Sequence, residues 1–177
     1  MLLLNVHPIK VSKILNFNAL KTLYMSLIMP YLSYCCVIWG NASKCIIQKV
    51  IVLQKRVIRV VCNSKYSDHT LPLFRKCKLL KFEDLVNTNI LIIMFKVYHN
   101  LLPDNIQKFF IKNINCPYRT RLYGKFNTMY LRTNLKSSSI SFTGVKLWNS
   151  LSCDMVNLTC LNKFKQNLKN NIIESYC

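Results

Sequence analysis

The stretch KCIIQKVIVLQKRVIRVVC, residues 44–62, decides the fold class of this chain. Its apolar residues recur at helical spacing, and Ser43 precedes them as a suitable N-cap. At 100° per residue, one side of the helix collects six apolar residues, which are Ile46, Val50, Leu53, Val57, Val60 and Val61. Ile47, Ile51 and Ile58 widen that side. We therefore predict an amphipathic helix that Asn63 and Ser64 terminate.

The opposite arc of this helix is cationic. It carries Lys49, Lys55, Arg56 and Arg59, with Gln48 beside them. Gln54 is the exception, because it falls among the apolar positions. A buried glutamine needs hydrogen-bond partners, so we expect Gln54 to bond a neighbouring backbone or side-chain group.

Working outward, the first hundred residues keep a helical pattern. A helix that extends from the Glu83-Asp84 pair to about Asn100 is apolar on most sides, and we expect it to be the central buried helix. Shorter helices are predicted at residues 18–28, 31–39, 73–76 and 104–111, with Asn18 as the first cap and a break at Pro30. The side chains expected in the core are Trp39, Leu53, Val57, Ile93, Met94 and Trp148.

From about residue 113 the chain is polar, basic and richer in strand-forming residues. The pattern predicts strands at 128–133 and 138–143 joined by a hairpin, a helical turn around Trp148, and a last helix over 159–173. The predicted fold class is therefore mainly α, with a helical domain at 1–112. Residues 113–177 are predicted to form a basic tail region with short strands and a C-terminal helix.

The charge balance indicates a polyanionic partner. The 177 residues include 25 Lys and Arg against 6 Asp and Glu, so the formal net charge is +19. No carboxylate precedes Asp68, and none lies between Asp104 and Asp154, which leaves two uncompensated basic zones. Such zones favour a phosphate-tracking surface, although an ordinary solvated helix face is the alternative. The residues expected to contact phosphates are Lys44, Lys49, Lys55, Arg56, Arg59, Lys65, Arg119, Arg121 and Arg132.

Aromatic residues interleave with the second basic zone. They are Tyr118, Tyr123, Phe126 and Tyr130. Stacking of bases on these rings and burial of the rings in a small core are equally compatible with the pattern.

Composition excludes several function classes. Hydrophobic residues make up 51% of the chain, which excludes intrinsic disorder, and the three glycines cannot build a P-loop or a Rossmann fingerprint. The nine cysteines contain no C-x-x-C pair, so neither a metal site nor a cofactor is expected. Without a secretory leader, we expect an intracellular protein of the nucleus or cytoplasm, whose cysteines are reduced, small buried side chains.

The uncharged segment TLYMSLIMPYLSYCCVIW, residues 22–39, approaches the length of a membrane span. Pro30 in its middle, with its serines and tyrosines, favours two short helices packed in a protein core. A helical membrane-associated protein remains the alternative, but a membrane is not the expected partner.

Eight blocks follow one another along the chain, namely LYMSLIMPYLSYCCVIWGN (23–41), LQKRVIR (53–59), HTLPLF (69–74), YHNLLP (98–103), Thr120-Arg121, Arg132-Thr133, GVKLWNSL (144–151) and FKQNLK (164–169). In this order they resemble non-LTR retrotransposon reverse transcriptases of the jockey and LINE type. The likeness spans roughly residues 14–175, and it lies in the order and spacing of the blocks more than in any one of them.

The resemblance implies the helical thumb and C-terminal tail of such an enzyme, as in a truncated copy. It would direct Lys49, Lys55, Arg56 and Arg59 towards template–primer phosphates without reading sequence. The chain contains no Asp-Asp pair, so the resemblance implies no catalysis by this chain alone. Implied partners are RNA or DNA backbone, the missing palm domain and a full-length element protein, while a non-functional translated remnant is the remaining alternative.

Overall fold

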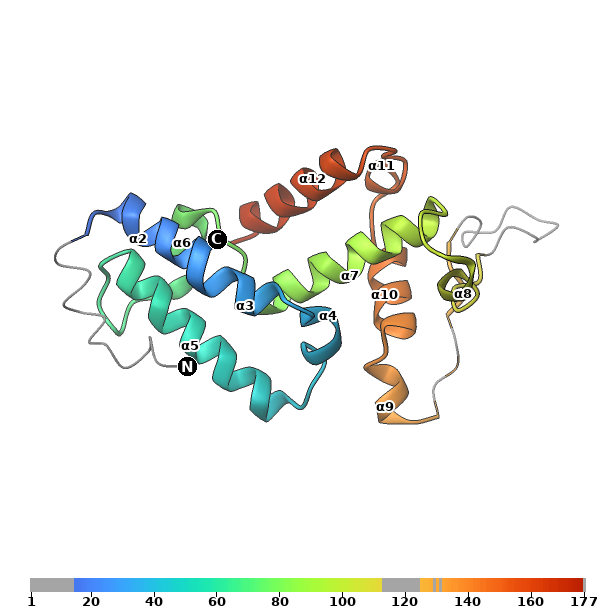
Figure 1. The fold of residues 1–177 in the computed structure, drawn as a ribbon, viewed down its shortest axis with the longest axis horizontal. Helices are drawn as coiled ribbons and strands as arrows, with labels where there is room; N and C mark the ends of the chain where they lie inside the picture. Colours follow the sequence, from blue (N-terminus) through green and yellow to red (C-terminus); the bar gives the residue numbers. More distant parts are fainter. Residues whose placement is uncertain (1–14, 113–124, 129, 131, 177) are drawn as a thin grey trace. The chain divides into compact units, whose positions relative to one another are not determined.

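The computed structural model describes residues 15–112, 125–128, 130 and 132–176 (Figure 1). Within these ranges the chain is mainly helical, which confirms the predicted class. The β-structure recorded for them is a single antiparallel bridge between Lys112 and Phe126. The described elements therefore pack as helix on helix.

The chain divides into two compact units, residues 1–85 with 169–177 and residues 86–168. The predicted division after residue 112 falls inside the second unit and stays a prediction. The first unit contains α2 (Phe17–Leu23), the π-turn η1 (Tyr24–Ile28), α3 (Met29–Ser33), α4 (Cys36–Trp39), α5 (Lys44–Val61), α6 (Thr70–Cys77), the start of α7 (Phe82–Tyr98) and the end of α12 (Leu161–Glu174). The second contains the rest of α7 and of α12, with α8 (Asp104–Gln107), α9 (Asn134–Ser137), α10 (Ile140–Asn149) and α11 (Cys153–Val156).

Residues 17–33 form one helical run that passes through Pro30. Proline lacks an N–H and crowds the preceding turn, and the run accommodates it by widening to the π-turn at Tyr24–Ile28. The predicted break at Pro30 is therefore wrong. The helix ends instead at Tyr34, and Cys35 then adopts a left-handed φ of 49°. Its N-cap is Asn16 rather than Asn18, because the Asn16 side chain accepts the Ala19 N–H at 2.9 Å.

In the first unit, α5 packs against α2 and α6. The core there consists of Leu20, Tyr24, Ile58, Val61, Phe74, Cys77, Leu79 and Tyr176. The buried face of α5 follows Gln54, Ile58 and Val61, whereas Ile46 and Leu53 are 56% and 38% exposed. The centre of the six-residue apolar side predicted for α5 is therefore rotated by roughly 80° from the observed one, although Val61 from that set and Ile58 beside it are buried.

In the second unit, the later part of α7 is surrounded by aromatic side chains. Phe95 lies 4.6 Å from Phe164 and 6.5 Å from Trp148 between ring centroids, and all three are buried. This confirms that α7 is a central buried helix. Of the six side chains predicted in the core, Met94 and Trp148 are buried, Trp39, Val57 and Ile93 are partly buried, and Leu53 is exposed.

The predicted β-hairpin is wrong. The segment expected to form its turn and second strand folds as α9 and α10, with Ser139 in extended conformation as the N-cap of α10. Gly144, Val145 and Trp148 lie on the buried face of α10, so burial overrides the strand preference of the local residues. Residues 129 and 131 of the first predicted strand lie outside the described residues.

Candidate nucleic-acid interface

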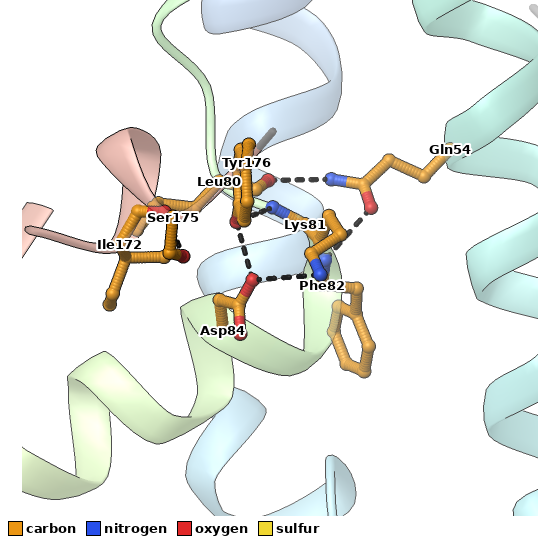
Figure 2. Close-up of polar contacts among 8 residues, drawn as sticks. All are labelled: Gln54, Leu80, Lys81, Phe82, Asp84, Ile172, Ser175 and Tyr176. Atoms are coloured by element: carbon orange, nitrogen blue, oxygen red, sulfur yellow. Dashed lines mark hydrogen bonds and ion pairs between the residues drawn. The ribbon is translucent and has the colours of Figure 1, made fainter. Parts of the chain in front are cut away.

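Three hydrogen bonds made by the Gln54 side chain, two donated and one accepted, fix the rotation of α5 about its axis. The Gln54 amide nitrogen donates to the Leu80 carbonyl at 3.1 Å and to the Tyr24 hydroxyl at 3.0 Å. Its oxygen accepts the Phe82 N–H at 2.9 Å, as Figure 2 shows together with the bond to Leu80. The expectation that a buried Gln54 is bonded is therefore confirmed. These bonds join α5 to the chain at the start of α7, so the side of α5 opposite Gln54 faces solvent.

The outward side of α5 is the cationic arc predicted from sequence. Lys44, Lys49 and Arg56 are exposed, and Lys55 and Arg59 are partly exposed. Lys65, in the turn that follows, is also exposed. We call these six residues the basic face, and all six belong to the first unit.

The turn after α5 holds Arg59 in place. Asn63 adopts a left-handed φ of 51°, and the Ser64 N–H returns to the Arg59 carbonyl at 2.9 Å. The Arg59 Nε donates to the Asp68 carbonyl at 3.1 Å, and its guanidinium lies 5.5 Å from the centre of the Tyr66 ring. The Tyr66 ring is 76% exposed, so an aromatic surface stands beside the cations. Sequence reasoning missed Tyr66, although its position directly after Lys65 was a usable signal.

The α5 part of the basic face carries no carboxylate of its own. All six carboxylate side chains of the protein are among the described residues, and none is on α5. Asp68 lies nearest along the chain, and its carboxylate, which accepts the Lys65 backbone N–H at 2.9 Å, places one negative charge at the end of the basic face. Asp84 lies 3.4 Å from the Lys81 ammonium and accepts the Tyr176 hydroxyl (Figure 2). The cations of the basic face are thus available to an external anion.

The structure describes only part of the second basic zone predicted from sequence. Arg119 and Arg121, with Tyr118 and Tyr123, lie outside the described residues. Arg132 is exposed but belongs to the second unit, so no described unit joins it to the basic face.

The two described aromatic residues of that zone differ in exposure. Phe126 is buried, so it is a core residue. Its backbone N–H donates to the Asn149 side-chain oxygen at 3.1 Å, and its carbonyl accepts the Asn149 side-chain N–H at 2.9 Å. Tyr130 is 87% exposed.

No cluster of metal-ligating side chains is formed by the residues that the structure describes. The His99 ring lies tilted against the Phe95 ring, with 4.3 Å between the ring centroids, and one of its ring nitrogens contacts the Leu158 carbonyl at 3.1 Å. These contacts give His99 a packing role. Glu83 and Asp84 occupy the first turn of α7, as predicted.

The cysteines are less buried than expected. Of the seven described, Cys36 and Cys77 are buried and Cys62 is partly buried, while Cys35, Cys45, Cys153 and Cys160 are exposed. Backbone N–H groups of Lys163 and Asn162 at the start of α12 lower the pKa of Cys160. The prediction of uniformly buried thiols is therefore wrong.

Residues 22–39 are packed in a core only in part. Tyr24 and Cys36 are buried, but six large apolar or aromatic side chains are exposed, namely Leu23, Met25, Leu27, Tyr31, Tyr34 and Ile38. Among the described helices, none combines the length and the apolar character that a membrane crossing requires.

Comparison of the chain with protein-family models, curated protein sequences and solved structures gives no match.

Proposed function

We propose that this chain is a non-catalytic, nucleic-acid-binding fragment of a non-LTR retrotransposon reverse transcriptase. It grips template–primer phosphates without sequence specificity, through the basic face. The observation that carries this proposal is the exposure of the α5 cations opposite the Gln54 anchor, on a helix that has no carboxylate. The helical architecture and the ordered sequence blocks support the same interpretation.

The dimensions of the basic face suit a nucleic-acid strand. At about 1.5 Å per residue, the helix from Lys44 to Arg59 covers roughly 22 Å. Phosphates of one strand recur about every 3.4 Å along a duplex axis, so this length corresponds to roughly six of them. Lysine ammonium groups bind phosphates as point charges, and the planar guanidinium groups of Arg56 and Arg59 suit two phosphate oxygens at once. The hydrogen bond to Asp68 orients Arg59 before the ligand arrives.

In this proposal the polymerase aspartates are supplied by a separate palm domain, on its own or within a full-length element protein. The exposed apolar side chains between Leu23 and Ile38 offer a surface that such a protein partner would cover. The expected compartment is the nucleus or the cytoplasm, where the nucleic-acid partner is found.

Fluorescence anisotropy with two labelled oligonucleotides of unrelated sequence tests the proposal. At low salt we expect binding with Kd values that agree within about threefold, because phosphate contacts do not read bases. A strong preference for one sequence would contradict the backbone-gripping mechanism. No binding to either oligonucleotide at low salt would favour the non-functional remnant instead.

A further inference from the structure

Two thiols touch where α5 ends and α6 ends. Cys62 is the C-cap of α5 and Cys77 is the last residue of α6, and their Sγ atoms lie 3.2 Å apart. Cys77 is fully buried within the core of the first unit, and Cys62 is partly buried against it. The pair therefore combines a sulfur–sulfur contact with limited access from solvent.

The backbone around the pair allows a covalent link. A disulfide needs about 2.05 Å between the sulfurs, so from 3.2 Å they must approach by roughly 1.1 Å. Both residues precede left-handed residues that end their helices, Asn63 at φ 51° and Lys78 at φ 55°. Helix ends next to turns adjust more readily than helix interiors, so the approach does not require repacking of the core.

We propose that Cys62 and Cys77 are a thiol–disulfide site, which low-molecular-weight disulfides such as oxidised glutathione convert to an intramolecular cross-link. The Cys62 thiolate attacks the small disulfide, breaks its S–S bond, and releases one small thiol. The Cys77 thiolate then attacks the Cys62 sulfur, forms the protein S–S bond, and releases the second small thiol. Two protein thiols lose two electrons and two protons, and the small disulfide is reduced to two thiols.

Access and acidity set the order of these steps. Burial, together with the contact to Cys62, raises the pKa of Cys77 to about 12, so few Cys77 side chains are thiolates at neutral pH. The more accessible Cys62 therefore reacts first, and closure by Cys77 is the slower step, which accelerates as pH rises. The pair stays a dithiol in a reducing compartment and responds when small disulfides accumulate.

The cross-link closes the segment that carries the end of the basic face. Residues 62–77 contain Lys65 and Tyr66, as well as Asp68, whose carbonyl holds Arg59. Oxidation ties the end of α5 to α6 and removes conformational freedom from the unfolded chain. This inference stands on the sulfur geometry, and it holds whether or not the chain binds nucleic acid.

The test oxidises the full chain with a series of oxidised-to-reduced glutathione ratios, blocks the remaining thiols, and maps the tryptic peptides. We expect a disulfide between the tryptic peptides 60–65 and 77–78. It should form at an oxidised-to-reduced glutathione ratio about tenfold lower than any other cysteine pair requires. The thermal midpoint of the oxidised protein should rise by about 5 °C. Cys62→Ser and Cys77→Ser should each abolish the link and the rise, whereas Cys45→Ser, at an exposed cysteine, should change neither.

Two outcomes would overturn the proposal. One is a folded protein in which glutathione stays attached to Cys62 and no 62–77 link forms. The other is a 62–77 link that forms no more readily in the folded chain than in the same chain in denaturant. Preference for the pair only in the folded chain would support the proposal, because it assigns the selectivity to the sulfur contact.

Discussion

Gln54 is the residue on which the orientation of α5 depends. Its amide joins three groups from two other parts of the first unit, the Tyr24 hydroxyl, the Leu80 carbonyl and the Phe82 N–H. The sequence predicted that Gln54 needs partners, because an amide among apolar residues must be bonded. It did not predict which partners, since they lie 26 to 30 residues away along the chain.

Replacing Gln54 with leucine should destabilise the protein strongly. Leucine has a similar volume but leaves the Phe82 N–H and the Leu80 carbonyl buried without this partner, and we expect a loss of about 3 kcal/mol. Urea unfolding measures it. Gln48→Leu on the exposed side of the same helix is the matched control and should change stability by about 0.5 kcal/mol or less. Equal effects of the two substitutions would show that the Gln54 bonds do not anchor the helix.

Buried thiol and phenol groups should make the stability of the protein decrease at alkaline pH. Burial raises the pKa values of Cys77, to about 12, and of Tyr24 and Tyr176 above their usual 10.0. In the unfolded chain these groups lose their protons first, so their contribution to stability is fully present below about pH 9 and decreases as pH rises further.

Thermal melts between pH 8 and pH 11 test this dependence. The midpoint should fall over the range, and Tyr176→Phe should melt lower at pH 8 but fall less steeply, because one titrating hydroxyl is gone. A midpoint that does not move between these pH values would contradict the burial of these groups.

At the scale of the element, α5 shows why periodicity gave the right helix but misplaced the centre of its buried side. Ten aliphatic residues surround much of the helix, so the apolar side has no sharp centre in sequence. The observed side is set by what α5 packs against, namely α2 and α6, and by the Gln54 anchor. Tertiary contacts of this kind cannot be read from one helix alone.

The loss of stability caused by an aspartate on α5 depends on which side of the helix is buried. Ile58→Asp should destabilise by about 4 kcal/mol or more, because Ile58 has no exposed surface and an aspartate there has no partner. Leu53→Asp should cost about 1 kcal/mol, since the Leu53 side chain is 38% exposed. Chemical denaturation of both variants locates the centre of the buried side, and a larger effect at Leu53 would place it on the six-residue set expected from sequence.

The approach of α10 to α7 depends on Gly144. A Cβ at this position would lie 2.8 Å from the Met94 sulfur and 3.3 Å from an Ile90 methyl carbon. Alanine would gain about 1 kcal/mol of helix propensity but would overpack a buried contact, which costs about 1–3 kcal/mol. Gly144→Ala should therefore be destabilising by about 1 kcal/mol in urea unfolding. Lys146→Ala, at an exposed position of the same helix, should be nearly neutral, and a stabilised Gly144→Ala would disprove the close packing.

The α9 and α10 region shows where sequence reasoning failed on element type. Serines, threonines and β-branched residues over 128–143 favour strands and therefore suggested a hairpin. Gly144, Val145 and Trp148 are all buried on one side of α10, and only a helix brings residues at this spacing to the same side. Ser139 then serves as an N-cap instead of a strand residue. Pro30 is the comparable case in the first unit, where the π-turn keeps a helix that proline was expected to break.

At the scale of the whole molecule, charge distribution was the most predictable feature. The uncompensated cations before Asp68 were visible in sequence, and the structure places six of them, those of the basic face, on one side of α5 and in the turn after it. Exposure of Tyr66 beside Arg59, and of the side chains between Leu23 and Ile38, depended on packing that no local pattern encodes. The proposed function rests on the first of these features.

Salt-dependent binding of nucleic acid tests that function most directly. Titrations of a labelled duplex at several salt concentrations give log Kobs against log salt, with a slope of about −0.9 per phosphate contact. We compare the wild type with a variant carrying glutamine at Lys49, Lys55, Arg56 and Arg59. The charge-matched control carries glutamine at Lys146, Lys163, Lys165 and Lys169, all exposed and outside the basic face. Circular dichroism checks that both variants keep the helical fold.

If the basic face grips phosphates, the α5 variant loses up to four contacts. Its slope should then be flatter than the wild-type slope by roughly 3, with weaker binding to every sequence. The control variant has the same net charge and should keep most of the wild-type slope. An α5 variant that keeps the wild-type slope, or a control that flattens as much as the α5 variant, would contradict the assignment of nucleic-acid binding to the basic face.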